Sequence, residues 1–352
     1  MIRVPPLPPA ITTISAPGYP SPVDTQLTAR RPATIPTVRP RPALGVAMVL
    51  ASGVLFGVNG TVSKLILDAG LDSPHLTLLR AVGAASGLLV LAVVVRPGLR
   101  RLSVSVRDLP LLVTYGLAGF FAVPMLYFVA ISRLPVGIAL LFEYTAPLLV
   151  ALWARFGQRH RVKARLWYGL ALALLGLGCV AQVWQGRLNL DGIGVAAGLG
   201  AAGLLCFYYI LGARGVTQRD TISLTWWAFA VSAVAGLLYA AVTGGTHVFP
   251  FGIMGHTSHG IPVWALAIYL VLGGSVSSYL LVAAALRHLP PTSVGIIGMI
   301  EPVVASAVAW VVLREHLSPA QLAGGVLILS GVAVAETART PGPGEPAEVP
   351  PA

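Results

Sequence analysis

The chain has 352 residues, of which 56% are hydrophobic and only 10% charged, and its mean hydropathy is +0.82. Soluble domains carry about 25% charged residues, so this composition excludes an ordinary soluble protein and predicts a polytopic membrane protein. The formal charge of +11 is divided into short clusters between apolar runs. Without a stacking platform or a basic helix face, that charge does not predict nucleic-acid binding.

The two ends of the chain differ in composition from the rest. Residues 1–42 are rich in proline and have no helical period, as in "RRPATIPTVRPRP". They contain no apolar stretch of the kind found in secretory signal peptides. We expect disordered cytoplasmic tails over 1–42 and 338–352.

Ten apolar runs lie between the tails, each close to the roughly 20 residues that a bilayer-spanning helix requires. Their length and the lack of strict alternation exclude membrane strands. The predicted spans are 44–67, 75–95, 110–132, 135–155, 165–184, 191–212, 222–243, 262–286, 291–313 and 319–337.

The basic residues predict the orientation of these spans. With the N-terminus in the cytoplasm, the inside segments hold eighteen Arg and Lys residues and the outside segments hold three. Positively charged loops stay on the cytoplasmic side. We therefore expect a multi-pass protein of the cytoplasmic membrane with both termini inside.

The second half of the chain repeats the first. At an offset of 155, "LPPTSVGIIGMIEPVVASAVAW" from Leu289 matches the stretch from Leu134, and Gly169 and Gly176 meet Gly324 and Gly331. At an offset of 148, "DSPHLTLLRAVGA" from Asp72 matches the stretch from Asp220. The predicted domains are two five-helix repeats, 43–184 and 190–337. Because five is odd, the second repeat enters the membrane inverted, as in many secondary transporters, with the site near the midplane.

This organisation resembles the EamA branch of the drug/metabolite transporter superfamily. The matching pieces are "FGVNGTVSK" at 56–64, "LTLLR" at 76–80, residues 301–335 and their weaker mate at 146–179. The resemblance covers about residues 44–337. It implies a carrier that moves small metabolites without ATP, often as an exporter of amino acids or toxic compounds.

Two acids interrupt long apolar runs. Glu143 lies in the fourth run and Glu301 in the ninth, where a charge costs at least about 2.5–3.5 kcal/mol on insertion scales. Each is a candidate proton or substrate-amine site; the alternative is a structural ion pair or packing hydrogen bond. Arg80, in the second span, is a candidate partner of Glu143 or a binder of a substrate carboxylate, and snorkelling is its alternative.

Uncharged polar residues give further candidates. Ser52 and Asn59 lie on one stripe of the first span, and Ser275 and Ser278 lie together in the eighth. Tyr144, beside Glu143, is a candidate cavity residue. Since unpaired polar groups in lipid are costly, each of these faces either a cavity or protein, and the sequence leaves binding and packing open.

Pro147 and Pro302 occupy matched positions in the fourth and ninth spans. Each removes a backbone hydrogen bond and favours a bend. We expect them to be paired hinges for alternating access, with proton coupling through Glu143 or Glu301 as a further hypothesis.

No cofactor or metal site is expected, and the partners are a small-molecule substrate and the lipid bilayer. A lipid-modifying enzyme and a channel remain as alternatives; three histidines of one outer loop, His247, His256 and His259, are the only metal-like grouping. Substrate, direction, coupling ion and oligomeric state stay open. Ser318 and Gln321 predict a capping box at the last helix.

Overall fold

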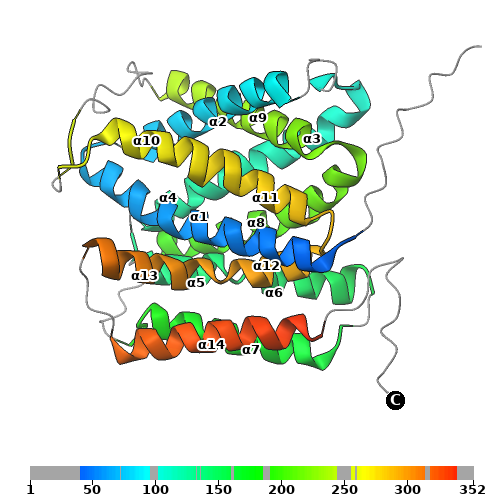
Figure 1. Ribbon diagram of the computed structural model, residues 1–352, viewed down its shortest axis with the longest axis vertical. Helices are drawn as coiled ribbons and strands as arrows, with labels where there is room; N and C mark the ends of the chain where they lie inside the picture. The colour runs from blue at the N-terminus through cyan, green and yellow to red at the C-terminus, as the bar shows by residue number, and fades with distance from the viewer. Residues whose placement is uncertain are drawn as a thin grey trace, which may run out of the picture. The chain divides into compact units, whose positions relative to one another are not determined.

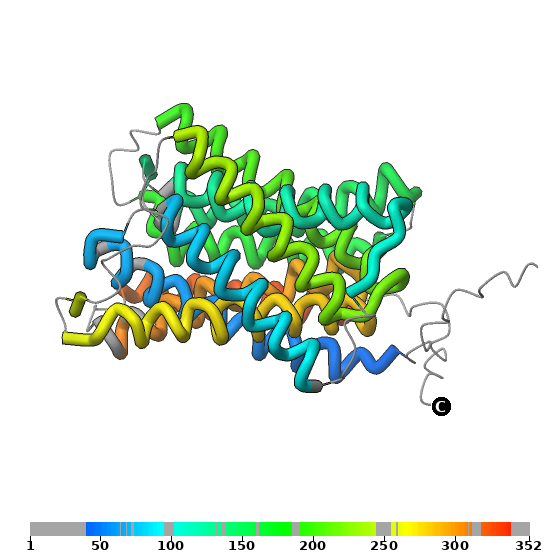
Figure 2. Tube along the Cα trace, turned by 90° about the horizontal axis from the view of Figure 1, so that it is seen from above, coloured from blue at the N-terminus to red at the C-terminus, as the bar shows by residue number. Residues whose placement is uncertain are grey.

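The computed structural model describes residues 40–71, 73–95, 102–131, 133–134, 136–159, 162–184, 191–243, 255–257, 260–313 and 318–338. Within these ranges the structure is helical, apart from connections and one isolated β bridge. The helices run along roughly one common direction (Figures 1 and 2).

The first repeat contributes five helical segments, three continuous and two composite. They are α1 (Pro42–Asp68); α2 (Ser73–Val95); α3 (Leu109–Tyr115), η3 (Gly116–Ala122) and α4 (Val123–Ile131); α5 (Val136–Glu143), α6 (Ala146–Leu152) and η4 (Trp153–Gly157); and α7 (Ala164–Val180). A short turn, η2 (Val106–Asp108), precedes α3.

The second repeat contributes the same five segments in the same order. They are α8 (Gly192–Gln218); α9 (Thr221–Val242); α10 (Val263–Val271), η6 (Leu272–Ser277) and α11 (Ser278–Ala285); α12 (Pro291–Gly298) and α13 (Glu301–Leu313); and α14 (Pro319–Glu336).

These segments confirm the predicted all-helical membrane fold. Nine of those in the described residues are long and apolar enough to cross a bilayer, and α7, with 17 residues, is shorter. Large apolar side chains such as Leu175, Phe207 and Val242 stand exposed along the helices, as expected for surfaces that face lipid rather than water. The fifth span ends four residues earlier than expected, because Gln182, with φ +50°, leaves the helical region in the turn after α7.

Glycines hold α7 and α14 together in an antiparallel crossing, seen at one edge of the bundle in Figure 1. A β-carbon built on Gly169 would lie 2.5 Å from the Gly331 carbonyl oxygen, and one on Gly176 would lie 2.6 Å from that of Gly324. Only glycine permits backbones this close. In the repeat, Gly169 matches Gly324 and Gly176 matches Gly331. Gly169 therefore faces Gly331, the mate of Gly176, and Gly176 faces Gly324, the mate of Gly169. This exchange is the contact pattern of an inverted pair.

The first helices of the two repeats show the same exchange. Gly45 of α1 packs on Leu289, at the start of the ninth span, while Gly194 of α8 packs on Leu134, at the start of the fourth. Leu134 and Leu289 are repeat mates. Each first helix therefore packs on the fourth span of the opposite repeat, which places the fourth and ninth spans at the centre of the inverted pair.

The fourth and ninth spans are broken at matched positions. Tyr144 and Thr145 separate α5 from α6, and Met299 and Ile300 separate α12 from α13. The Thr145 amide donates to the Phe142 carbonyl, and the Ile300 amide donates to the mate of that carbonyl, Ile297, both at 3.1 Å. The bends expected at the prolines are thus two-residue breaks just before them.

Candidate functional site

A cavity of about 570 Å³ lies where the two broken helices meet, lined by residues of both repeats. Proline explains why the helices break there. Pro147 and Pro302 are the second residues of α6 and α13. Proline has no amide hydrogen for the carbonyl four residues earlier and is tolerated in the first turn of a helix.

Most of the residues singled out in the sequence converge on this cavity. Those that line it are Ser52, Asn59, Arg80, Glu143, Tyr144, Glu301 and Pro302. Three lie outside its lining: Pro147, Ser275 and Ser278. Helices α1 and α2 and the two broken spans therefore surround the same cavity.

The two acids stand at the two breaks, one before the break of the fourth span and one after the break of the ninth. Glu143 is the last residue of α5, and Glu301 is the first residue of α13. Their positions differ by three residues in the repeat register, one helical turn, and their charges are close enough to interact. The hydroxyl of Tyr144 donates to Glu301 Oε2 at 2.6 Å. The described residues donate no hydrogen bond to the Glu143 carboxyl.

Arg80 is held by groups other than the two acids. Its Nη2 donates to the Phe120 carbonyl at 3.3 Å, and its guanidinium carbon lies 5.7 Å from the centre of the Tyr279 ring. The Phe120 carbonyl is available because Pro124, four residues later, lacks the amide hydrogen it would otherwise accept. Arg80 makes no direct ion pair with Glu143 among the described contacts, so its charge remains available to the cavity.

The Phe120 carbonyl was not identified from the sequence as the partner of Arg80. It also accepts a hydrogen bond from Ser232 Oγ at 3.0 Å, so one freed carbonyl ties together the second, third and seventh spans. The position of Pro124 in the sequence is the signal that could have found it.

The serines of the eighth span bond to their own helix. Ser275 Oγ donates to the Leu270 carbonyl and Ser278 Oγ to the Gly273 carbonyl, both at 2.8 Å. Ser52 Oγ donates to the Ser278 carbonyl at 3.1 Å, so Ser52 both lines the cavity and ties α1 to α11. These bonds satisfy the widened π-helical turn η6.

Asn59 packs against the same turn. A β-carbon on Gly274 would collide with the Asn59 side chain, so this glycine makes room for the amide. The Oδ1 atom of Asn59 is buried and has no partner among the described residues. Buried polar groups are normally paired, so this amide is available to a ligand or an ordered water.

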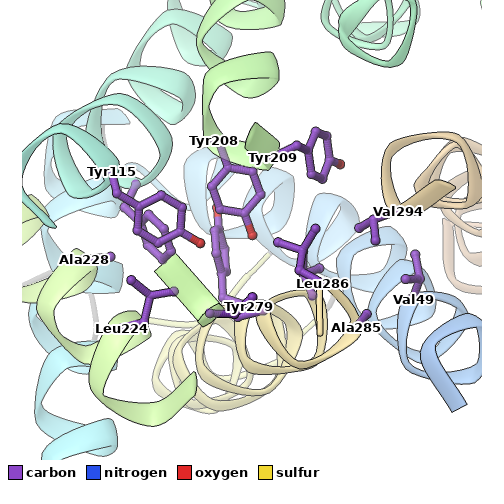
Figure 3. Close-up of a cluster of buried hydrophobic side chains, with 14 of the residues drawn as sticks. Val49, Tyr115, Tyr208, Tyr209, Leu224, Ala228, Tyr279, Ala285, Leu286 and Val294 are labelled. Atoms are coloured by element: carbon purple, nitrogen blue, oxygen red, sulfur yellow. The ribbon is translucent and has the colours of Figure 1, made fainter. Parts of the chain in front are cut away.

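An aromatic cluster forms the wall behind Arg80. Tyr115 and Tyr208 stack at 5.4 Å between ring centres, and Phe120 lies 4.6 Å from Tyr279. Figure 3 shows Tyr115, Tyr208 and Tyr279 gathered together, with Tyr209 beside them on the same helix as Tyr208. Tyr208, Tyr209 and Tyr279 line the cavity, as does Tyr127 of α4.

The cavity reaches one end of the helices. Its lining extends to Leu67 of α1, to Val180 at the end of α7 and Gln182 just after it, and to Gln321 of α14. Gln182 Nε2 donates to Ser318 Oγ, which also accepts from the Gln321 amide in a capping box. That capping box confirms the one predicted at the last helix.

The opposite end of the bundle is tied together by charged groups. Arg219 lies 3.8 Å from Asp108 (Nη2 to Oδ2) and donates to the Ser103 carbonyl. Arg287 Nη2 donates to the Arg219 carbonyl at 2.9 Å. These contacts join the ends of the third, sixth and eighth spans.

Most of the outer loop with the three candidate metal-binding histidines lies outside the described residues. Of its three histidines only His256 falls in the described residues, where it is exposed; His247 and His259 lie outside them. Within the described ranges no three His, Cys, Asp or Glu residues gather in a way that could hold a metal ion.

Comparisons with known proteins agree with this architecture. A crystal structure of a protein 18% identical in sequence superposes with a TM-score of 0.70, covering 84% of this chain and 98% of that one. The threonine/homoserine exporter RhtA of Escherichia coli K12 is 29% identical over 273 residues, 76% of this chain and 83% of the exporter. The RhtA of Salmonella typhimurium LT2 is 30% identical over 256 residues, 71% of this chain and 77% of the exporter.

An uncharacterized transporter of Archaeoglobus fulgidus is 28% identical over 83% of this chain and 96% of its own length. The EamA-like transporter family matches twice, at residues 43–182 and 192–337, once for each five-helix set. These two matches include all the cavity residues named above. The chain is a multi-pass membrane protein of the EamA-like transporter family, a family of transporters rather than enzymes.

Proposed function

We propose that this protein is a secondary active carrier of the cytoplasmic membrane that exports small metabolites such as amino acids by alternating access. The observation that carries the proposal is the cavity with Arg80, Glu143 and Glu301 in its lining, at the crossing of two broken, repeat-matched helices. Inverted-repeat carriers bind their substrates at such breaks near the midplane. The relatives named as threonine/homoserine exporters support an amino acid as the substrate and export as the direction.

The two ends of the cavity support alternation. Positive loops assign the end with Asp108, Arg219 and Arg287 to the cytoplasm and the end with Gln182 to the outside, with both termini inside. The structure then represents an outward-facing state, tied shut on the cytoplasmic side. Opening that side while closing the other requires the halves to rock, with the breaks before Pro147 and Pro302 as hinges.

The closed cytoplasmic end favours a carrier over a channel, because a channel needs one path open at both ends. The distinguishing experiment is counterflow. Purified protein is reconstituted in vesicles loaded with an unlabelled amino acid, and uptake of the same labelled amino acid is followed. A carrier gives a transient accumulation that saturates with concentration. Flux that rises linearly, without accumulation, would instead indicate a channel.

A further inference from the structure

The charge of the cavity restricts which metabolite it can hold. Among the described residues that line it, three carry charge at neutral pH: Arg80, Glu143 and Glu301. These three residues come from α2, α5 and α13, so the net charge of the lining depends on three helices. With both acids ionised, the described side chains that line the cavity have a summed formal charge of −1.

The groups that face Glu143 do not alter this sum. Beyond Glu301 and Arg80, the ionisable groups that interact with it are phenols from the elements packed around it. They are Tyr127 of α4, Tyr144 of the break, Tyr209 of α8 and Tyr279 of α11. A phenol titrates near pH 10 and is neutral at physiological pH.

The two acids are unequal. Glu301 stands at the amino end of the 13-residue helix α13 and accepts the Tyr144 hydrogen bond; both features stabilise a carboxylate. Glu143 stands at the carboxyl end of α5 and accepts no hydrogen bond from the described residues. The partial negative charge of a helix carboxyl end opposes a second carboxylate. One acid with a hydrogen-bond donor among the described residues and one without therefore face each other across the cavity.

One further positive charge makes this cavity neutral. A proton on the acid pair supplies it, and so does a solute with a net charge of +1. A zwitterionic amino acid adds no net charge and leaves −1 uncompensated, and an unbalanced charge near the bilayer centre is unfavourable.

We propose that the cavity takes an amino acid carrying one net positive charge, with a second basic group besides its α-amine, in exchange for one proton of the Glu143–Glu301 pair. The inference rests on the proposed function and names its substrate class. The α-carboxylate lies on Arg80, and the ammonium groups lie on the two glutamates. Binding from the cytoplasm displaces the proton to the cytoplasm. Release outside is followed by proton uptake from outside, so one positive charge moves each way.

Counterflow in vesicles tests this directly. Vesicles containing the full-length protein are loaded with unlabelled lysine or threonine and given the same labelled amino acid. We expect the apparent affinity for lysine to exceed that for threonine by at least tenfold. Raising the pH should strengthen lysine binding, because fewer protons compete, and should weaken any residual threonine binding, because a zwitterion leaves the cavity neutral only while the acid pair holds its proton. A pH gradient should drive lysine without a change in membrane potential.

Glu143→Gln makes the cavity neutral without a proton. We expect this variant to reverse the preference, with the lysine-to-threonine affinity ratio falling at least tenfold and its pH dependence lost. The matched control is Asp191→Asn, which removes one acid outside the cavity, at the start of α8, and keeps a residue that caps helices well; the wild-type ratio should persist. If Glu143→Gln is not monodisperse after purification, Glu301→Gln and the wild-type pH series carry the test.

Each outcome separates the two proposals. Counterflow of threonine without lysine in the wild-type protein overturns the charge rule and leaves amino-acid transport standing. The charge rule is equally wrong if Glu143→Gln keeps the wild-type ratio and pH response. If no amino acid shows counterflow in the wild-type protein, the proposed amino-acid substrate itself is wrong, and the charge rule falls with it.

Discussion

Two crossings in this molecule are made from equivalent parts and serve different ends. At one, α7 meets α14 through four glycines, with backbones in contact. At the other, the fourth span meets the ninth near two breaks, and both spans line a cavity of about 570 Å³. Both crossings lie between repeat mates. Small residues without proline close the first, whereas the second, which opens onto the cavity, contains prolines and acidic residues.

The difference teaches how a duplicated bundle can move without falling apart. A close glycine crossing is stabilised by many short contacts and resists displacement. A crossing of broken helices loses those contacts, so its two halves can exchange neighbours at lower cost. We infer that the first crossing is a fixed element and that the second undergoes the change during transport.

The largest expected effect is at the glycine crossing. Gly176→Leu places a side chain where the Gly324 carbonyl oxygen would lie 2.6 Å from its β-carbon, and backbone cannot move aside as a side chain can. We expect a loss of at least about 3 kcal/mol, the upper part of the usual range for overpacking. The readout is the fraction of monodisperse protein and its thermal midpoint in detergent.

Gly178→Leu is the matched control, since nothing lies within 4 Å of a β-carbon at that position of the same helix. It should purify like the wild-type protein. Equal loss in both variants would mean that replacing any of these glycines with leucine destabilises α7, whether or not the backbone of α14 is near. The contrast between the two crossings would then lose its support.

A smaller effect is expected at the broken crossing, where changes should alter transport more than stability. Tyr144→Phe removes the hydrogen bond to Glu301, and a hydrogen bond to a charged group contributes about 1.5–3 kcal/mol. We expect the apparent affinity for the counterflow substrate to fall about tenfold or more, with a smaller loss in thermal midpoint than Gly176→Leu gives. Tyr127→Phe, which removes a cavity hydroxyl without a hydrogen bond to the described residues, should have little effect on either. An unfolded Tyr144→Phe protein would instead assign this bond to structure.

The smallest effect is expected outside both crossings, at the exposed start of α8. Asp191 accepts from the Gly194 amide at 2.8 Å, and this bond, with Arg133 nearby, lowers the pKa of the carboxyl below its ordinary value. A carboxyl with a lowered pKa stabilises the fold above about pH 4 and loses that contribution as pH falls through the folded value. Any advantage of wild type over Asp191→Asn in thermal midpoint should therefore shrink below about pH 4. An advantage that grows on acidification would contradict the assignment.

The span pattern and the repeat register were predictable because both follow from hydropathy and from matched Pro and Gly positions. The breaks were expected at Pro147 and Pro302, but residues 144–145 and 299–300 carry them. A proline acts on the backbone before it, by constraining the preceding residue and depriving the carbonyl four residues back.

The surroundings of the candidate residues were less predictable. The sequence suggested Glu143 as a partner for Arg80, yet the guanidinium bonds to the Phe120 carbonyl and lies over Tyr279. Ser275 and Ser278 bond to carbonyls of their own span instead of lining the cavity. Residue type identifies which groups need partners in a membrane, whereas tertiary packing decides which partner each group meets.

The inversion of the repeats is tested most directly by labelling matched positions from one side of the membrane. Arg165 at the start of α7 and Ala320 at the start of α14 are repeat mates at the offset of 155. Each is changed to cysteine after the free Cys179 and Cys206 are replaced by alanine, and intact cells are treated with an impermeant maleimide. We predict that position 320 reacts in intact cells and that position 165 reacts only after the membrane is opened. Reaction of both positions from the same side would contradict an inverted pair.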